Sequence, residues 1–296
     1  MTLFLGILLA LLCALATNIG FLYKHRGACA AEPVNVRHPW RSAKSLFRSK
    51  LFAIGWAIAT GAWVFHVAAM AVAPLSLVQA VLAGGVVLLA VMAERMFGLK
   101  IGRRQWIGLG ATAVGLILLG VTLPVAHGAH SRFSVPGMIS FEGALIVGGT
   151  LLIMGPRIGA PHEHHGFLLG AAAGILFGVS DIAIKAISGL VGAHGFMGLI
   201  TPWTLMTIVA SVVAFYASAK GLQDGEAVPV IAVTGTAANL SGIVGGILVF
   251  GDPLSGNPLA LGIQCTAFLL VLMAAWLMPA PVRAAGRALA PAAAVA

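Results

Sequence analysis

The chain has 296 residues, of which 60% are hydrophobic and only 8% charged, and its mean hydropathy is +1.03. An ordinary soluble domain carries about 25% charged residues, so this composition excludes a soluble enzyme and a disordered interaction protein. The net charge of +9 would otherwise suit a nucleic-acid binder, but the hydropathy excludes that partner as well. Three cysteines, Cys13, Cys29 and Cys265, do not make a disulfide scaffold.

The apolar residues come in runs of about twenty, the length that a helix needs to cross ~30 Å of hydrocarbon. These runs lack the alternation of polar and apolar residues that a transmembrane strand requires. We therefore predict an all-α membrane protein, a polytopic bundle of about nine transmembrane helices. In chain order the predicted spans are Thr2 to Tyr23, Leu51 to Val72, Leu75 to Ala93, Trp106 to Leu123, Val135 to Gly155, Phe167 to Ser188, Gly198 to Ala219, Val228 to Phe250 and Pro258 to Met278.

The basic residues predict the orientation of these spans. An odd number of spans places the two termini on opposite sides of the membrane. Of the 17 Lys and Arg residues, all but Arg132 and Lys185 fall in or beside loops on one side. Because cytoplasmic loops carry the excess of Lys and Arg, we expect the N-terminus outside and the C-terminus in the cytoplasm, in the cytoplasmic (inner) membrane. Contact with anionic lipid headgroups is a further consequence.

Two halves of the chain resemble each other. Pro74, Phe97-Gly98 and Gly108 recur as Pro229, Phe250-Gly251 and Gly262 at a nearly constant offset, and Asn18 falls opposite Asp181. The spans then divide as four, one and four: a first repeat over 1–123, a bridging helix over 135–155, a second repeat over 167–278 and a short cytoplasmic tail over 279–296. The odd bridging span inverts the second repeat, and inverted repeats are the architecture of alternating-access carriers.

Several motifs resemble a known family. The stretches Ala73-Pro74-Leu75-Ser76-Leu77-Val78-Gln79, Glu94-Arg95-Met96-Phe97-Gly98-Leu99-Lys100 and Gln105-Trp106-Ile107-Gly108 are similar to the third-to-fourth-span signature of the drug/metabolite transporter superfamily (EamA-like). Leu248-Val249-Phe250-Gly251-Asp252-Pro253-Leu254 resembles its second copy. The nine-span layout and Phe21-Leu22-Tyr23-Lys24-His25-Arg26-Gly27 look more like the NIPA-type magnesium transporter branch. Where the family commonly has Gly-Glu before the fourth span, this chain has Gly98-Leu99.

Charged residues inside a span need a partner, water or a function, because each costs roughly 2.5 to 3.5 kcal/mol at the bilayer centre. Asp181 and Lys185 are four residues apart in the sixth span and so share a helix face. They form either a neutral pair or a free carboxylate that contacts the substrate or coupling ion. Asp181 also continues a stripe of small residues formed by Gly166, Gly170, Gly174 and Gly178. Such a stripe favours close helix packing, so we expect Asp181 to face protein or a cavity.

Glu142 in the fifth span is the second intramembrane carboxylate. Together with Asp181 it would form a two-carboxylate site, a common way to hold hydrated Mg²⁺. The alternatives are a protonated carboxyl or one kept wet at the interface. The two-carboxylate interpretation requires that both side chains point into one cavity.

Other polar side chains within spans are His66, Asn18, Gln79 and Asn239. Each either forms hydrogen bonds between helices or lines a transport path, and His66 is also suited to proton handling. The tract His162-Glu163-His164-His165 is interpreted as a polar cytoplasmic loop, with weak metal sensing as the alternative. The sequence identifies neither a metal site nor a cofactor.

We conclude from the sequence that the chain is a secondary carrier of a small polar metabolite or drug-like cation. Asp181 would be the polar anchor, with Asn18, Gln79, Asn239, His66 and Glu142 as further binding or coupling residues. The alternative is a divalent-cation (Mg²⁺) transporter. The absence of a P-loop, Gly-x-Ser-x-Gly or His-Glu-x-x-His motif argues against ATP-driven transport and against an enzyme. The expected partners are the substrate and membrane lipid, and homodimerisation stays open.

Overall fold

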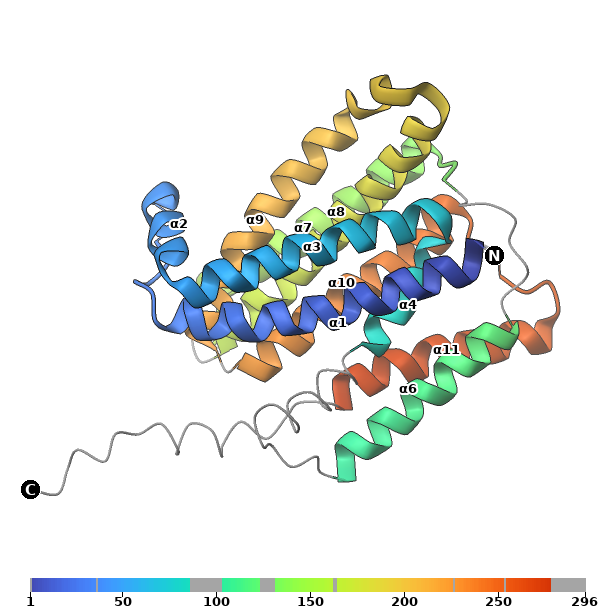
Figure 1. Ribbon diagram of the computed structural model, residues 1–296, viewed down its shortest axis with the longest axis horizontal. Helices are drawn as coiled ribbons and strands as arrows, with labels where there is room; N and C mark the ends of the chain where they lie inside the picture. The colour runs from blue at the N-terminus through green and yellow to red at the C-terminus, as the bar shows by residue number, and fades with distance from the viewer. Residues whose placement is uncertain are drawn as a thin grey trace, which may run out of the picture.

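The computed structural model describes residues 2–35, 37–85, 103–122, 131–161, 164–225, 227–252 and 254–277, and over these residues the chain is helical with no β-strand. Long helices run back and forth along one direction (Figure 1). In chain order the α-helices are α1 (Thr2–Cys29), α2 (Pro39–Arg48), α3 (Lys50–Val72), α4 (Leu75–Gly84), α6 (Arg103–Thr122), α7 (Val135–Ile153), α8 (His165–His194), α9 (Pro202–Asp224), α10 (Ala227–Phe250) and α11 (Pro258–Leu277). The short 3-10 helices η1 (Gly155–Ile158) and η3 (Gly195–Leu199) follow α7 and α8.

Six segments of the described chain are long and apolar enough to cross a membrane, so the protein is a multi-pass membrane protein. They comprise α1, α3, α7, α8 together with η3, α9 and most of α10. Two shorter apolar helices, Leu75–Gly84 and Pro258–Leu270, occupy further predicted spans. Residues 86–93 of the third predicted span and the tail 279–296 lie outside the described residues. The count of nine spans therefore stays a prediction.

The helix boundaries follow local chemistry. Helix α3 ends at Val72 because Ala73 is extended, with φ of −135° and ψ of 158°, as a residue before proline prefers. Helix α4 then begins directly after Pro74. The seventh span begins at Pro202, not at Gly198 as predicted, because η3 occupies the preceding residues and Thr201 is extended. Helix α2 was not predicted, because its residues looked like part of a basic loop.

The long helices pack in pairs within and between the two halves of the chain. In the first half α1 packs on α3, and in the second half α8 packs on α9. Helix α4 contacts α10, and α6 contacts α11, so each of these pairs joins the two halves. The chain enters at the end marked N in Figure 1 and α1 runs away from it, whereas α8 returns toward that end. Helix α7 packs mainly on α8.

The glycine stripe of α8 brings this helix against α9 and α10. A Cβ on Gly174 would collide with the backbone carbonyl of Thr234, and one on Gly178 would collide with the side chain of Ser241. At Gly166 the obstacle is the backbone of Gly225. The packing role predicted for these glycines is therefore confirmed, since only hydrogen fits there.

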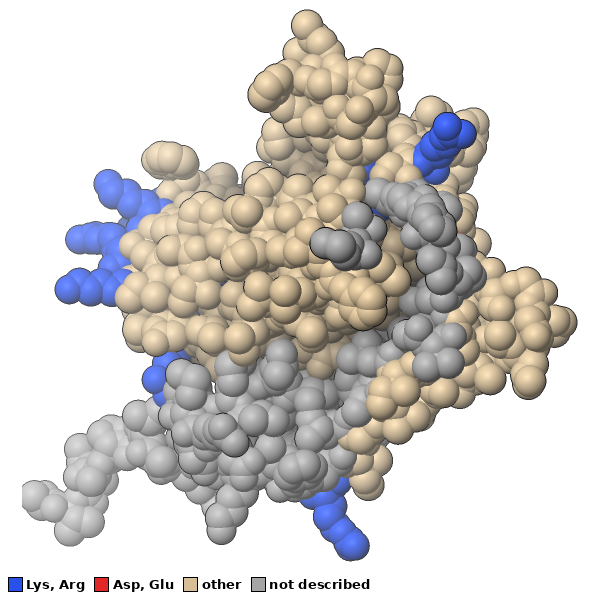
Figure 2. Space-filling model, turned by 45° about the vertical axis from the view of Figure 1, so that its right-hand side comes forward, with Lys and Arg blue, Asp and Glu red and all other residues tan. Residues whose placement is uncertain are grey.

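Basic side chains gather at one end of the bundle. The region where α1 ends, α3 begins and α9 ends carries Arg26, helix α2, Lys50 and Lys220. Figure 2 shows Lys and Arg mainly at the left-hand end of the face it presents, beside a broad uncharged surface. Arg132 lies at the other end, since its neighbour Ser131 packs against Gly189 late in α8. Arg95, Lys100, Arg283 and Arg287 lie outside the described residues.

The contact at Gly174 predicts a difference between two glycine substitutions. Gly174→Ala forces a methyl group into the Thr234 backbone and should lower the free energy of unfolding by about 1–3 kcal/mol. Gly148→Ala is the matched control, because its Cβ would meet no atom within 4 Å. Thermal unfolding in detergent, followed by tryptophan fluorescence, measures both variants. Equal melting temperatures would contradict the close approach of α8 and α10.

Candidate functional site

A cavity of about 230 Å³ lies among α1, α3, α4, α8 and α10. It gathers side chains from both halves of the chain. Five of the six predicted site residues line it: Asn18, His66, Gln79, Asp181 and Asn239. The sixth, Glu142, does not. The structure thus brings together residues that the sequence placed in five separate spans.

Asp181 lies between two side chains from the first half of the chain, one that donates a hydrogen bond and one within ion-pair distance. The Nε2 atom of Gln79 donates a hydrogen bond of 2.7 Å to Oδ2 of Asp181. The Nε2 atom of His66 lies 3.2 Å from Oδ1, and the two side chains keep 10% (His66) and 16% (Asp181) of their surface exposed. The carboxylate is therefore held by α3 and α4 and can still be reached from the cavity.

A chain of polar groups continues behind His66. The Sγ atom of Cys13 lies 3.8 Å from Nδ1 of His66 and 3.7 Å from Oγ1 of Thr17. Cys13 and Thr17 were not predicted as site residues. They share one face of α1 with Ala14 and Asn18, and this spacing was the available indication in the sequence.

The amide side chains leave oxygen atoms available. Asn18 donates from Nδ2 to the carbonyls of Ala14 and Gly85, each at 2.8 Å, so its Oδ1 is free to accept. Oε1 of Gln79 has no hydrogen-bond partner among the described residues although it is buried. A buried acceptor without a donor costs about 1–3 kcal/mol.

The cavity also has aromatic and basic walls that the sequence did not indicate. Phe21, Trp63 and Phe177 line it together with Lys24. The Nζ atom of Lys24 lies 3.9 Å from the centroid of the Phe21 ring, a distance typical of a cation–π contact. Lys24 lies near the end of α1, so it marks the side of the cavity that faces the basic end of the bundle.

The opposite side of the cavity is closed by apolar packing. The cavity is lined by the later part of α1 and the earlier part of α10, so it extends toward the end that carries α2. Toward the other end lies the largest buried cluster, which includes Met70, Leu75, Met138, Ile182 and Phe250. The cavity is therefore asymmetric along the bundle.

Lys185 is not paired with Asp181, and that interpretation of the sequence was wrong. Its side chain is fully buried, and Nζ donates to the carbonyls of Met70 and Ala73, both at 2.8 Å. These carbonyls are free because α3 ends before Pro74 and cannot bond them itself. A lysine at a helix C-terminus is also favoured by the helix dipole.

Asp252 binds the start of α4, on the other side of the break between α3 and α4. Its Oδ2 accepts a hydrogen bond of 2.7 Å from the backbone nitrogen of Ser76, one of the first amides of α4 that has no partner within the helix. Lys185 and Asp252 belong to the second half of the chain, and the groups they bind belong to the first. We call these three hydrogen bonds the Lys185–Asp252 clamp.

Glu142 lies apart from the cavity. Its side chain is 1% exposed, and neither carboxylate oxygen has a hydrogen-bond partner among the described residues. The predicted two-carboxylate site with Asp181 is therefore not formed, because the helix face of α7 that carries Glu142 does not border the cavity. The described residues also contain no group of three or more His, Cys, Asp or Glu side chains placed to hold a metal ion.

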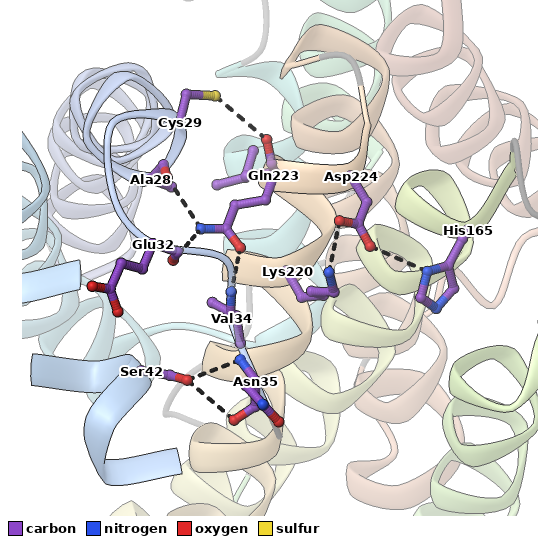
Figure 3. Close-up of polar contacts among 11 residues, drawn as sticks. Ala28, Cys29, Glu32, Val34, Asn35, Ser42, His165, Lys220, Gln223 and Asp224 are labelled. Atoms are coloured by element: carbon purple, nitrogen blue, oxygen red, sulfur yellow. Dashed lines mark hydrogen bonds and ion pairs between the residues drawn. The ribbon is translucent and has the colours of Figure 1, made fainter. Parts of the chain in front are cut away.

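The last histidine of the tract, His165, takes part in an ion-pair cluster at the basic end of the bundle. Nδ1 of His165 lies 3.2 Å from Oδ2 of Asp224, and Nζ of Lys220 donates to Oδ1 at 2.8 Å (Figure 3). His162 and Glu163 lie outside the described residues. His165 thus ties the start of α8 to the end of α9, and it belongs to helix α8 and not to the predicted loop.

These features define a multi-pass helical membrane protein with a polar cavity built from both halves of its chain. The chain is similar to the "Probable magnesium transporter NIPA9" of Arabidopsis thaliana, with 22% identity over 283 residues, which cover 90% of this chain and 80% of that protein. No family model matches the chain, and no solved structure matches it.

The separation of Lys185 from Asp181 predicts how their substitutions combine. Lys185→Met should lower the free energy of unfolding by about 1–3 kcal/mol, because it leaves two buried carbonyls without a donor. Asp181→Asn keeps most of its surroundings and should have a smaller effect. In the double variant the two effects should add to within about 0.5 kcal/mol, since the side chains share no partner. Thermal unfolding of the wild type, the two single variants and the double variant measures these effects. A double variant that is more stable than Lys185→Met alone would show that the two side chains do form an ion pair.

Proposed function

We propose that the protein is a secondary transporter that moves a cation across the cytoplasmic membrane by alternating access. The observation that carries the proposal is Asp181, the only carboxylate among the described lining residues of the cavity. Its two partners come from the other half of the chain. A movement between the halves would therefore change how tightly Asp181 is held, which links cargo binding to a change of shape.

The pairing of the helices supports the predicted inverted repeat. Helices α1 and α3 correspond to α8 and α9, and the pairs α4–α10 and α6–α11 cross between the halves. In transporters built from inverted repeats the cargo site lies near the midplane between the repeats. The position of Asp181 near the middle of α8 fits such a site.

Polar contacts between the halves occur on both sides of the cavity. On the side away from the basic end is the buried Lys185–Asp252 clamp. At the basic end, Gln223 of α9 holds the backbone that follows α1: Nε2 donates to the carbonyls of Ala28 and Glu32, and Oε1 accepts from the Val34 nitrogen (Figure 3). We propose that the Lys185–Asp252 clamp and the Gln223 contacts are the two gates, and that each must open once in a transport cycle.

Mg²⁺ is the cargo that we favour. The cavity is lined by Asp181 and Asn18, whose side chains carry oxygen atoms, and Mg²⁺ prefers oxygen ligands while keeping several waters. A water takes about 30 Å³ in the liquid, so the cavity has room for a partly hydrated ion. The similarity to a protein named as a probable magnesium transporter over 90% of this chain supports the same cargo.

An organic cation is the second candidate. Phe21, Trp63 and Phe177 give the cavity aromatic walls, and aromatic faces attract cations such as quaternary ammonium groups. A hydrated metal ion has little use for these walls. This cargo corresponds to the drug-like cation expected from the sequence.

Transport should depend on Asp181 and not on the other buried carboxylate. In proteoliposomes with an internal Mg²⁺ indicator, Asp181→Asn should slow uptake at least about tenfold, because a hydrogen bond to a charged group is worth about 1.5–3 kcal/mol. Glu142→Gln is the matched control and should keep most of the activity, since Glu142 does not line the cavity. Unchanged uptake in a well-folded Asp181→Asn protein would remove Asp181 from the mechanism.

The two cargoes are separated by a second pair of measurements. If Mg²⁺ is the cargo, it should raise the melting temperature of the wild type and of Trp63→Ala, but not that of Asp181→Asn. A quaternary ammonium probe should then leave all three unchanged. Stabilisation by the ammonium probe that disappears in Trp63→Ala would instead identify an organic-cation carrier.

A further inference from the structure

Helix α2 differs from the other helices in direction. It joins α1 to α3 and lies across the ends of the long helices instead of alongside them (Figure 1). Its buried residues are Ser42 and Leu46, and Leu46 belongs to a cluster with Phe52 and Ala219. Tyr216 also donates from its hydroxyl to the carbonyl of Pro39, at 2.9 Å. The helix is thus fixed to the bundle, with its axis roughly in the plane that the membrane surface would take.

The outer face of α2 is basic. Arg41, Lys44 and Arg48 are exposed and follow one another at spacings of three and four, which places them on one face. Among the described residues none of the three forms an ion pair. Trp40, at the start of the helix, is 84% exposed. Basic residues next to an exposed tryptophan are typical of a helix that lies in the membrane interface.

Aromatic rings beside α2 mark the depth of that interface. The rings of Phe47 and Trp56 lie 5.4 Å apart, and those of Phe215 and Tyr216 lie 5.1 Å apart. Aromatic side chains gather at the level of the lipid headgroups. The aromatic rings next to α2 therefore fit a position of this helix at the level of the headgroups.

A pocket opens next to the basic face. It has a volume of about 330 Å³, and Asn35, His38, Arg41 and Ser45 are among its lining residues. Glu32 lines it too, but its one negative charge is outnumbered by Arg41, Lys44 and Arg48. The pocket is large enough for a headgroup and offers donors from a guanidinium, an imidazole and a hydroxyl.

We propose that α2 is a binding site for an anionic phospholipid of the leaflet that faces the basic end of the bundle. Arg41, Lys44 and Arg48 neutralise the phosphate, the pocket takes the headgroup, and Trp40 lies among the upper acyl chains. The proposal is independent of the cargo and of transport, since it requires only that this end meets the membrane surface.

The lipid would also act on the rest of the protein. Helix α2 and the segment before it are the parts that Gln223 and Tyr216 of α9 hold. A lipid bound to α2 would restrain the first half of the chain at the point where it contacts the second.

The fluorescence of Trp40 tests the proposal. The full-length protein is reconstituted in phosphatidylcholine vesicles that contain brominated phosphatidylglycerol or brominated phosphatidylcholine. The Trp40 signal is the difference between wild type and Trp40→Phe. The quenching should show a preference for phosphatidylglycerol of at least about fivefold, the value expected when a single Lys or Arg meets an anionic surface. In the triple variant Arg41→Gln, Lys44→Gln, Arg48→Gln the preference should fall to about one.

Trp203 provides the matched control, because it lies at the start of α9, at the other end of the bundle. Its signal, obtained with Trp203→Phe, should show no preference between the two lipids. Equal quenching of Trp40 by both lipids, or a preference that survives in the triple variant, would overturn the proposal. Loss of the preference in millimolar inorganic phosphate would assign the site to a free anion. If the triple variant does not fold, the comparison of Trp40 with Trp203 in otherwise wild-type protein decides.

Discussion

The interruption between α3 and α4 is the feature on which the site depends. Pro74 ends one helix and starts the next inside the bundle, where free backbone groups cannot turn to water. Lys185 and Asp252 bond those groups. The junction in turn orients His66, on the last part of α3, and Gln79, on the first part of α4, so that both meet Asp181. An uninterrupted helix would not present both side chains to one carboxylate.

The three charged residues that the sequence singled out within the predicted spans, Lys185, Glu142 and Asp181, have different environments. Lys185 bonds backbone carbonyls and is fully enclosed. Glu142 is enclosed without a partner among the described residues. Asp181 has partners and still borders a cavity. Only the last combination allows an incoming ligand to exchange with existing contacts, which is why the proposed cargo site rests on this residue.

The sequence predicted the helical class and the approximate position of every described α-helix except α2. Hydropathy sufficed because a membrane-crossing helix must be apolar along its whole length. It also identified Asn18, Gln79 and Asn239 as buried amides, and all three line the cavity. It could not choose a partner for Lys185, because the α3 carbonyls become available only through a tertiary contact. It could not place Glu142, since the rotation of α7 about its axis depends on packing. It did not predict α2, because the basic residues of that helix are also typical of a cytoplasmic loop. The inverted repeat and the nine spans stay predictions.

The position of one negative charge within the bundle has an electrical consequence. Binding of a doubly charged ion at Asp181 would add two positive charges to this site, so the loaded and the empty protein would differ there by two elementary charges. Each elementary charge that crosses a potential of 100 mV gains or loses about 2.3 kcal/mol. A potential that is negative inside would then favour inward movement of the loaded form over that of the empty form. The membrane potential would therefore add to the concentration gradient of the ion in setting the direction of net movement.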